Sequence, residues 1–400
     1  MIGVGTLAAA GLAVWTAAYV GTCAVALWGA RAQTTSLDLP ASPMPTVLLI
    51  RPCTGDEASL EPALRSTAAL AGVSGLAVRL TVDDADDPAW PIVRRVAVWL
   101  RERGLDARAE VARTQALNRK VGQLAVATRR TRAEVVMVVD ADVDLSTFDV
   151  RSFLAPLDVP RVGAVWAPPV EVGPVCTFGD RTSAAILGAS LHAFTLLGAL
   201  DPHGLVGKTF AVRTNALRQL GGFEALDRML GEDMALASRL RRGGWGTRMH
   251  CTPVRAVAHQ RSMASVLARY TRWLWVIRAQ RPHLLSSYPL LLAAAPLLFV
   301  AFAVLWPFAP AWAAALPLIA LSTRCAVAFA ASGPRGRRAA AVGWEWLLAD
   351  LVLLAAFARV FKTPTVRWRG RMLRLGTGGM LCDAAEAPRP ELSPVRPAGT

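Results

Sequence analysis

One short stretch, residues 133–144 with the sequence AEVVMVVDADVD, constrains the fold more than any other part of the chain. Its apolar run, Val135 to Val139, is too short for a buried helix and rich in β-branched residues, which predicts a central strand of a parallel sheet. Asp140 and Asp142 follow this strand. Open α/β sheets bind ligands at the carboxyl ends of their strands, and residues two apart share one side of a strand. The two acids are therefore predicted to face one cleft.

Two neighbouring carboxylates repel each other. A hard divalent cation such as Mg²⁺ or Mn²⁺ relieves that repulsion and also holds the oxygens of a nucleotide diphosphate. Asp140 and Asp142 are thus candidate metal ligands in a site for a sugar nucleotide. The pattern alone is weak, because most Asp-x-Asp pairs are solvated turn residues, so the rest of the chain has to decide between the two interpretations.

Composition predicts that part of this 400-residue chain lies in a membrane. Hydrophobic residues make up 54% of it and charged residues 18%, and the mean hydropathy is +0.37. Both values favour apolar segments in lipid over a purely water-soluble core. The net charge of +15 raises the question of nucleic acid. Arginines cluster beside apolar stretches, however, which favours positive-inside topology and anionic lipid as the partner, with no nucleic acid.

The chain is predicted to begin with a membrane anchor and to continue as an α/β domain. Residues 1–30 carry no charge and Arg31 follows them, which indicates an uncleaved transmembrane helix with its carboxyl end in the cytosol. Alternating strands and helices in residues 45–255, with acids at strand ends, predict a doubly wound nucleotide-binding domain. It has no Gly-x-Gly-x-x-Gly fingerprint. Lys208 lacks the P-loop glycine six residues earlier, where Pro202 stands, so we exclude an ATPase.

Further charged positions are predicted near the same edge of the sheet. Four acids at positions 83–87 follow a strand predicted at residues 76–82, and for the last two, which precede a proline, we favour a capped helix turn. Asn118 caps a helix that holds Lys120 in its first turn. Lysine is unfavourable at that position unless an anion lies nearby.

Glu232 and Asp233 begin another predicted helix, which carries arginines in its last turn. Acids at the start and cations at the end suit the helix dipole, so stability alone explains both charges. The functional alternative is a catalytic base, because an N-terminal carboxylate stays ionised and can accept a proton from an acceptor hydroxyl.

Residues 260–281 are predicted to form an amphipathic helix in the membrane interface. One face of this helix is apolar and consists of Met263, Val266, Leu267, Tyr270, Trp273, Leu274 and Ile277. Arg261, Arg269 and Arg272 gather roughly opposite, where we expect them to face the soluble domain and neutralise a leaving diphosphate. A simple lipid-surface anchor is the alternative.

Residues 284–331 are predicted to form two transmembrane helices, at 284–306 and 308–331, because each apolar stretch can cross about 30 Å of hydrocarbon. Arg324 interrupts the second stretch, at a place we expect to be near its end or inside a helix bundle.

The C-terminal part is predicted to stay at the membrane surface. Residues 342–361 contain Glu345 and Asp350 between basic flanks, so 342–375 is interpreted as a re-entrant or interfacial helix with a basic segment. The tail at 384–400 is rich in proline and predicted to be disordered.

A series of motifs follows along roughly residues 51–374: Arg51-Pro52, Val82 to Pro88, Asn118 to Val121, Asp140 to Asp142, Gly207 to Thr209, Gly221 to Phe223, Glu232-Asp233, Arg269 to Trp273 and Trp368 to Arg371. In this order the motifs resemble those of the ceramide glucosyltransferase family, glycosyltransferase family 21 of the GT-A fold, whose (Q/R)xxRW motif Arg269 to Trp273 matches. The chain departs from the family at Arg119, where proline is usual, and at Gly122-Gln123, where an amide pair is usual.

The resemblance implies a GT-A domain with a Rossmann-like mixed sheet, a divalent metal, and the inverting transfer of a sugar from a UDP-sugar to a lipid hydroxyl. Glucose and ceramide are the expected sugar and acceptor. The catalytic domain is expected on the cytosolic face of the bilayer, which is the cell inner membrane if the protein is bacterial.

The resemblance also assigns roles to residues. Asp233 is implied as the base that deprotonates the lipid hydroxyl, and Arg272 as the group that stabilises the departing UDP. Asp84 is implied to bind the uridine, and Asp140 and Asp142 to hold the donor and its metal. The remaining nucleotide-sugar positions are Arg51, Lys120, Arg269 and Trp273, the last of which also shapes the acceptor end.

Three alternatives stay open at this point. Another lipid acceptor, such as a hopanoid polyol or a diacylglycerol, fits the same motifs. A processive polysaccharide synthase shares their order, but it usually needs more membrane spans for a channel. A non-catalytic membrane scaffold would leave the acids as surface charge.

Overall fold

The structure is a computed structural model that describes residues 2–33, 43–190, 194, 196, 198, 201, 203–257, 259–292, 303, 305–332, 339–362, 365–368 and 371–383. The predicted tail at 384–400 and part of the predicted span at 284–306 lie outside these residues.

A seven-stranded mixed sheet forms the centre of the α/β domain, in the order β3-β2-β1-β4-β8-β6-β9. The strands are β1 (Val47–Pro52), β2 (Leu76–Val82), β3 (Asp106–Val111), β4 (Val135–Val139), β6 (Val162–Trp166), β8 (Thr209–Arg213) and β9 (Gly246–Met249). β1, β2, β3 and β4 are mutually parallel, whereas β8 runs antiparallel to both β4 and β6. The predicted α/β fold with a mixed sheet is confirmed.

Both faces of the sheet are covered, as the apolar run of β4 predicted. Val135, Met137 and Val139 belong to one hydrophobic core and Val136 and Val138 to the other, and all five are buried. This alternation follows from the two-residue period of a strand. The helices of this domain are α2 (Leu60–Arg65), α3 (Ala89–Arg101), α4 (Arg119–Thr128), α5 (Val150–Leu154), α8 (Thr214–Gln219) and α9 (Glu232–Arg242).

Two smaller sheets were not predicted. One has the order β5-β10-β7, from β5 (Val143–Asp144), β7 (Pro169–Val172) and β10 (Val254–Val257). The other consists of β11 (Thr365–Trp368), β12 (Arg371–Leu375) and β13 (Leu381–Asp383), and its first two strands are formed by the predicted basic segment. It docks beside the start of α9, where the backbone N–H of Leu230 donates to the carbonyl of Gly379. Because this docking joins segments far apart in the chain, local periodicity carries no signal for it.

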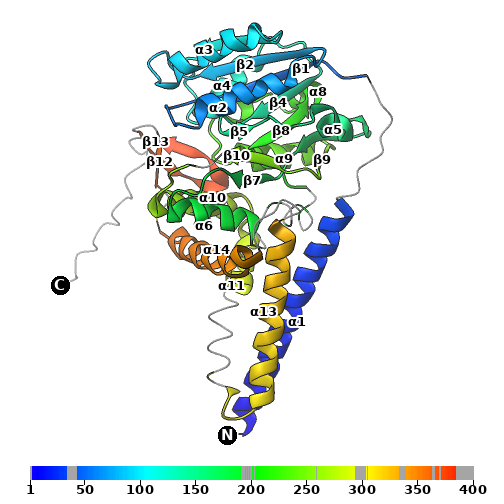
Figure 1. Ribbon diagram of the computed structural model, residues 1–400, viewed down its shortest axis with the longest axis vertical. Helices are drawn as coiled ribbons and strands as arrows, with labels where there is room; N and C mark the ends of the chain where they lie inside the picture. Colours follow the sequence, from blue (N-terminus) through cyan, green and yellow to red (C-terminus); the bar gives the residue numbers. More distant parts are fainter. Residues whose placement is uncertain are drawn as a thin grey trace, which may run out of the picture.

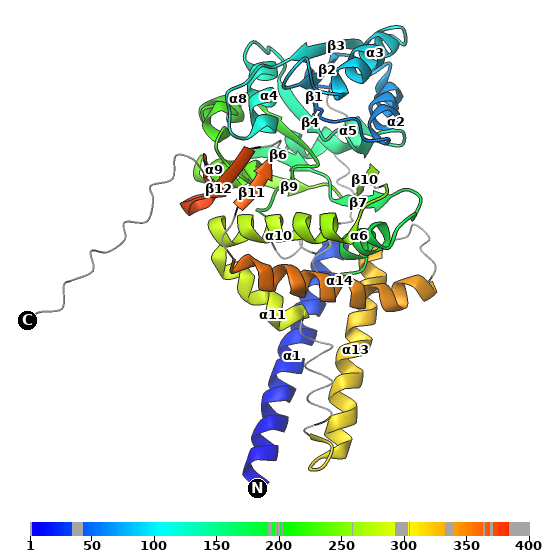
Figure 2. The same ribbon diagram turned by 90° about the vertical axis from the view of Figure 1, so that its left-hand side faces the viewer.

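A layer of helices lies below the sheet domain, and two long helices extend further away from that domain (Figures 1 and 2). The layer contains α6 (Phe178–Gly188), α10 (Met263–Gln280), α11 (Ser287–Leu292) and α14 (Ala339–Val360), and the long helices are α1 (Ile2–Gln33) and α13 (Pro310–Ser332). α1 packs against α13, and α14 lies across their direction in both views. Thr6–Ala30 in α1 and Pro310–Ala331 in α13 are long and apolar enough to span a membrane.

The apolar face of α10 is covered by protein. Val266, Tyr270 and Leu274 are buried against α14 and α6, in a cluster that includes Ala349 and Leu353 of α14. The sequence pattern of α10 predicts an apolar face correctly, but it does not say whether lipid or another helix meets that face.

Candidate active site

A cavity of about 1610 Å³ lies between the carboxyl end of β4, the start of α9 and the helix α10. It is lined by Lys120, Asp140, Asp142, Lys208, Glu232, Asp233, Arg261, Arg269, Arg272 and Trp273 on its polar side. Thr22 of α1 and Tyr288 and Leu291 of α11 also line it. The cavity therefore joins the charged edge of the sheet to the apolar helices below it.

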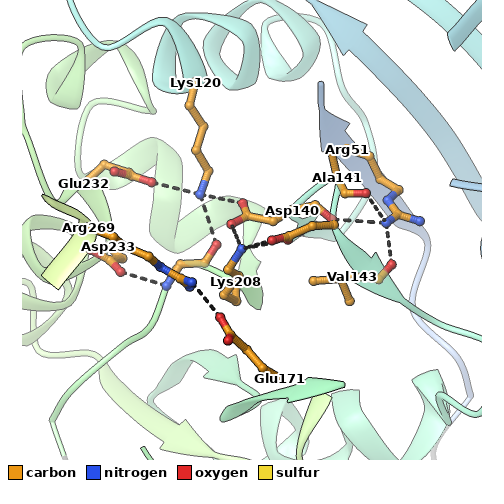
Figure 3. Close-up of polar contacts among 12 residues, drawn as sticks. Arg51, Lys120, Asp140, Ala141, Val143, Glu171, Lys208, Glu232, Asp233 and Arg269 are labelled. Carbon is orange, nitrogen blue, oxygen red and sulfur yellow. Dashed lines mark hydrogen bonds and ion pairs between the residues drawn. The ribbon is translucent and has the colours of Figure 1, made fainter. Parts of the chain in front are cut away.

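The two acids after β4 are held together by lysines (Figure 3). Lys208 Nζ lies 2.7 and 2.6 Å from the two carboxylate oxygens of Asp142 and 3.3 Å from Oδ2 of Asp140. Lys120 Nζ lies 2.8 Å from Oδ1 of Asp140 and 3.0 Å from Glu232. Burial lowers the pKa of Lys120, but the carboxylates of Asp140 and Glu232 outweigh it and hold that pKa above its usual value. Lys120 is thus a cation within the site, and the anions that the sequence required near it, Asp140 and Glu232, are present.

Arg51 supports the acidic turn from behind and does not line the cavity. Its side chain is fully buried, and it donates hydrogen bonds to the backbone carbonyls of Asp140, Ala141 and Val143 at 3.1, 3.3 and 2.5 Å. Burial lowers the pKa of Arg51 to about 10, so the guanidinium stays charged near neutral pH. The Nη1 and Nη2 groups of Arg51 donate inside the protein, which gives this side chain a positioning role for the acidic turn. Its predicted contact with the nucleotide sugar stays a prediction.

The acid that is buried after β2 is Asp83, and Asp84 is exposed. Asp83 Oδ2 accepts a hydrogen bond from Arg119 at 2.5 Å, and its Oδ1 accepts from the backbone N–H of Thr114 at 3.2 Å. Asp84 instead accepts from the backbone N–H of Asp86 within its own turn. The predicted uridine contact of Asp84 stays a prediction. Arg119 stands where the family usually has proline, and this extra cation is the sequence feature that could have indicated a nearby acid.

The start of α9 is shaped by Gly231, which has a φ of +74°. A Cβ at this position would lie 2.2 Å from Cγ1 of Val276 in α10, so only glycine fits here and lets α9 begin directly against α10. Asp233 Oδ2 accepts from the backbone N–H of Gly207 at 2.7 Å. Burial and the negative charge of Glu232 raise the pKa of Asp233 to about 6, which suits a base that works near neutral pH.

The arginine face of α10 points at these acids, as its periodicity predicted. Arg269 and Arg272 both line the cavity with Asp233. Arg269 lies 2.6 Å from Glu171 of β7, and its guanidinium stands 5.0 Å from the centre of the Trp273 ring. Burial and the charge of Arg269 lower the pKa of Arg272, so an anion entering the cavity would relieve the repulsion between these two cations.

Glu171 was missed in the sequence. Its side chain is 1% exposed, and one of its oxygens lies 2.5 Å from Arg261 and 2.6 Å from Arg269. Burial raises the pKa of Glu171, but the two arginines outweigh it and hold that pKa below its usual value. An acidic residue within the short apolar strand β7 could have indicated this site in the sequence, because a buried acid needs cations beside it.

Asp140 and Asp142 offer the hard oxygen ligands that Mg²⁺ or Mn²⁺ prefers. Their carboxylates share the Lys208 ammonium, so their oxygens converge on one small volume. Within the described part of the chain, no group of three or more His, Cys, Asp or Glu side chains could hold a metal ion. The pair would therefore supply only part of the coordination of such an ion, and its remaining ligands would have to come from outside these side chains.

The sequence matches the family model described as "Glycosyl transferase family 21" over residues 12–381. The chain belongs to glycosyl transferase family 21. The predicted family is thereby confirmed, and the cavity is the candidate active site of a family 21 glycosyltransferase. No curated protein matches the chain.

Two solved structures are similar to this family 21 chain. The mannosyltransferase PcManGT from Pyrobaculum calidifontis, in complex with GDP-Man and Mn²⁺, matches at 19% identity with a TM-score of 0.50, covering 89% of this chain and 99% of that one. TarS from S. aureus, in complex with UDP-GlcNAc, matches at 12% identity with a TM-score of 0.38, covering 84% of this chain and 98% of that one. The PcManGT likeness extends through nearly the whole chain and supports the GT-A fold.

Proposed function

We propose that this family 21 glycosyltransferase transfers a sugar from a UDP-sugar to a lipid hydroxyl with inversion at the anomeric carbon. Glucose is the proposed sugar and ceramide the proposed acceptor, on the strength of the resemblance. One observation carries the proposal: a single cavity is lined by Asp140, Asp142 and Asp233 and also by Thr22 and Leu291 from the apolar helices. Such a cavity suits a polar donor at one end and a lipid at the other.

Each group of cavity residues has a proposed role that follows from its chemistry. Asp233 takes the proton of the acceptor hydroxyl as it attacks, and its pKa of about 6 leaves it mostly ionised at neutral pH. Arg269 and Arg272 neutralise the charge that develops on the departing UDP. A divalent metal held by Asp140 and Asp142 would supply further positive charge at the diphosphate. The Mn²⁺ and sugar nucleotide bound by PcManGT support this part of the proposal.

The proposed location is a membrane with the catalytic domain on the cytosolic face. α1 and α13 support a membrane location, and Arg31 after the first apolar stretch supports the orientation.

Cys382 is exposed on β13. An impermeant maleimide should therefore label it in inside-out vesicles and not in right-side-out vesicles, and the reverse pattern would exclude this orientation.

Asp233→Asn tests the proposed base. The variant keeps the size of the side chain and can still accept from Gly207, so we expect UDP binding to persist while transfer falls by about 100-fold or more. Purified protein in lipid vesicles is incubated with radiolabelled UDP-glucose and ceramide, and the glycolipid is identified by mass spectrometry. Near-normal transfer by the variant would show that Asp233 is not the base.

The acceptor is tested in the same assay by replacing ceramide with a diacylglycerol or a hopanoid polyol. A product formed only from one of these lipids would replace ceramide in the proposal. Metal-dependent UDP-sugar binding without any product would favour a binding protein instead.

A further inference from the structure

Lys208 occupies a fixed place beside the two acids of the candidate metal site. Its backbone carbonyl accepts a hydrogen bond of 2.9 Å from the N–H of Asp140. Thr209, the next residue, pairs with Val139 in the antiparallel ladder of β8 and β4. The sheet register therefore sets the ammonium of Lys208 against Asp140 and Asp142, and its side chain is only 15% exposed.

The ammonium of Lys208 lies where a metal ion would have to bind. It contacts both oxygens of Asp142, at 2.7 and 2.6 Å, and one oxygen of Asp140, at 3.3 Å. A divalent cation ligated by the same oxygens would stand close to this ammonium, in a partly buried site where repulsion between cations is strong. A metal and Lys208 thus cannot both hold the two acids in this arrangement.

Lys120 is placed differently. Its ammonium is shared among Asp140, Glu232 and the carbonyl of Gly207, at 2.8, 3.0 and 3.0 Å. These partners come from three segments of the chain, so Lys120 stabilises the site from one side. Among the described residues, Lys208 pairs with the two candidate metal ligands themselves, which makes it the cation that a metal has to displace.

We propose that Lys208 is a built-in counter-ion that competes with the divalent metal for Asp140 and Asp142, so that the metal binds well only after the nucleotide diphosphate has arrived. The diphosphate gives the displaced ammonium a new anionic partner. Donor and metal then assist each other's binding by the same factor. This inference rests on the proposed function, because it takes the donor to be a nucleotide diphosphate.

Direct Mn²⁺ binding tests the proposal without any transfer reaction. Free Mn²⁺ is measured by electron paramagnetic resonance over detergent-solubilised full-length protein, with and without UDP. The variants are Lys208→Met and Lys208→Gln, which remove the charge, and Lys208→Arg, which keeps it. Lys362→Met is the matched control, because Lys362 is an exposed lysine that also lines the cavity.

Without UDP, we expect the two neutral variants to bind Mn²⁺ about tenfold more tightly than wild type. Lys208→Arg and Lys362→Met should bind it as weakly as wild type. With saturating UDP, the difference between wild type and the neutral variants should shrink, and UDP itself should bind the neutral variants more weakly. Two neutral variants are used, so the test still gives a result if either Lys208→Met or Lys208→Gln does not fold.

Unchanged Mn²⁺ affinity in both neutral variants without UDP would overturn the proposal, as would an equal gain in Lys362→Met. Either result leaves the proposed sugar transfer in place, since that is measured by product formation. Conversely, the absence of any glycolipid product from the wild-type protein would overturn the proposed transfer and would not alter the Mn²⁺ measurement.

Discussion

At Asp233, charges of both signs meet around one carboxylate. Burial and Glu232 raise its pKa, while Lys120 and the backbone N–H groups of Met234 and Gly207 lower it, with a result of about 6. Glu232 itself keeps a pKa below its usual value: burial raises that pKa, but Lys120 outweighs it. Adjacent acids in the first turn of α9 are thus made unequal by their surroundings, which is how one carboxylate becomes a base and the other a structural anion.

The rate of transfer should therefore depend on the ionisation of Asp233. Because a raised pKa keeps this carboxyl group protonated to higher pH, the rate should rise with pH up to about 6 and fall about tenfold per pH unit below it. Glu232→Gln removes a negative neighbour, so it should move this acid limb to lower pH. Initial rates between about pH 4.5 and 8 measure both effects. An acid limb at the same pH in both proteins would contradict the role given to Glu232.

At the level of elements, the site depends on how closely α9 begins against α10. Gln280, the last residue of α10, donates hydrogen bonds to the carbonyls of Leu230 and Gly231 at 2.9 and 3.1 Å. Gly231 supplies the left-handed conformation that ends this loop. The same contact brings Arg269 and Arg272 of α10 to the cavity that Asp233 lines.

Gly231→Ala should displace the start of α9 as well as strain the backbone. The strain alone is worth about 1–2 kcal/mol, and Gly104→Ala measures it, since Gly104 has a φ of +85° and a Cβ added there would meet no atom within 4 Å. In Gly231→Ala the overlap with Val276 adds to that loss, and transfer should fall by about 100-fold because Asp233 moves. Unfolding in detergent and initial rates are measured for both variants. Equal losses of stability and activity in the two would argue against a tight α9–α10 contact.

For the whole molecule, the connection between the apolar helices and the catalytic domain runs through a buried ion pair. Arg324 of α13 and Asp350 of α14 are each 2% exposed and lie 2.7 Å apart. Arg324 also donates to the carbonyl of Ala189, just after α6, at 3.0 Å. The consecutive helices α13 and α14 are therefore held at one point to the end of α6, which is distant in the chain, and α14 in turn packs against α10.

Breaking this pair from one side should be costly. Arg324→Met or Asp350→Leu alone leaves a buried charge without its counter-charge, and each should lower the free energy of unfolding by about 3–5 kcal/mol. The double variant removes both charges, so its loss should be clearly smaller than the sum of the two single losses. Unfolding of the four proteins in one detergent gives the double-mutant cycle. Additive losses would mean that the two side chains do not stabilise each other.

Several parts of the site were predictable because they depend on local pattern. The run of β-branched residues in β4 specified a buried strand, and the acids after it followed from the geometry of α/β sheets. The helical period of α10 placed Arg269 and Arg272 on one face. Charges that pair across long distances in the chain were not predictable in this way. Glu171 meets Arg269 only because the tertiary fold brings these two distant segments close together.

By itself, the sequence determined which segments form strands and helices, which faces are apolar, and which acids follow a strand or begin a helix, because these depend on the chemistry and spacing of neighbouring residues. The tertiary structure decided that Asp83 and not Asp84 is buried, that Arg51 supports the acidic turn, and that Lys208 holds Asp140 and Asp142. Those outcomes depend on strand direction and on packing between distant segments. Strand direction and packing are fixed by many weak contacts throughout the chain, so neither can be inferred from a short stretch of sequence.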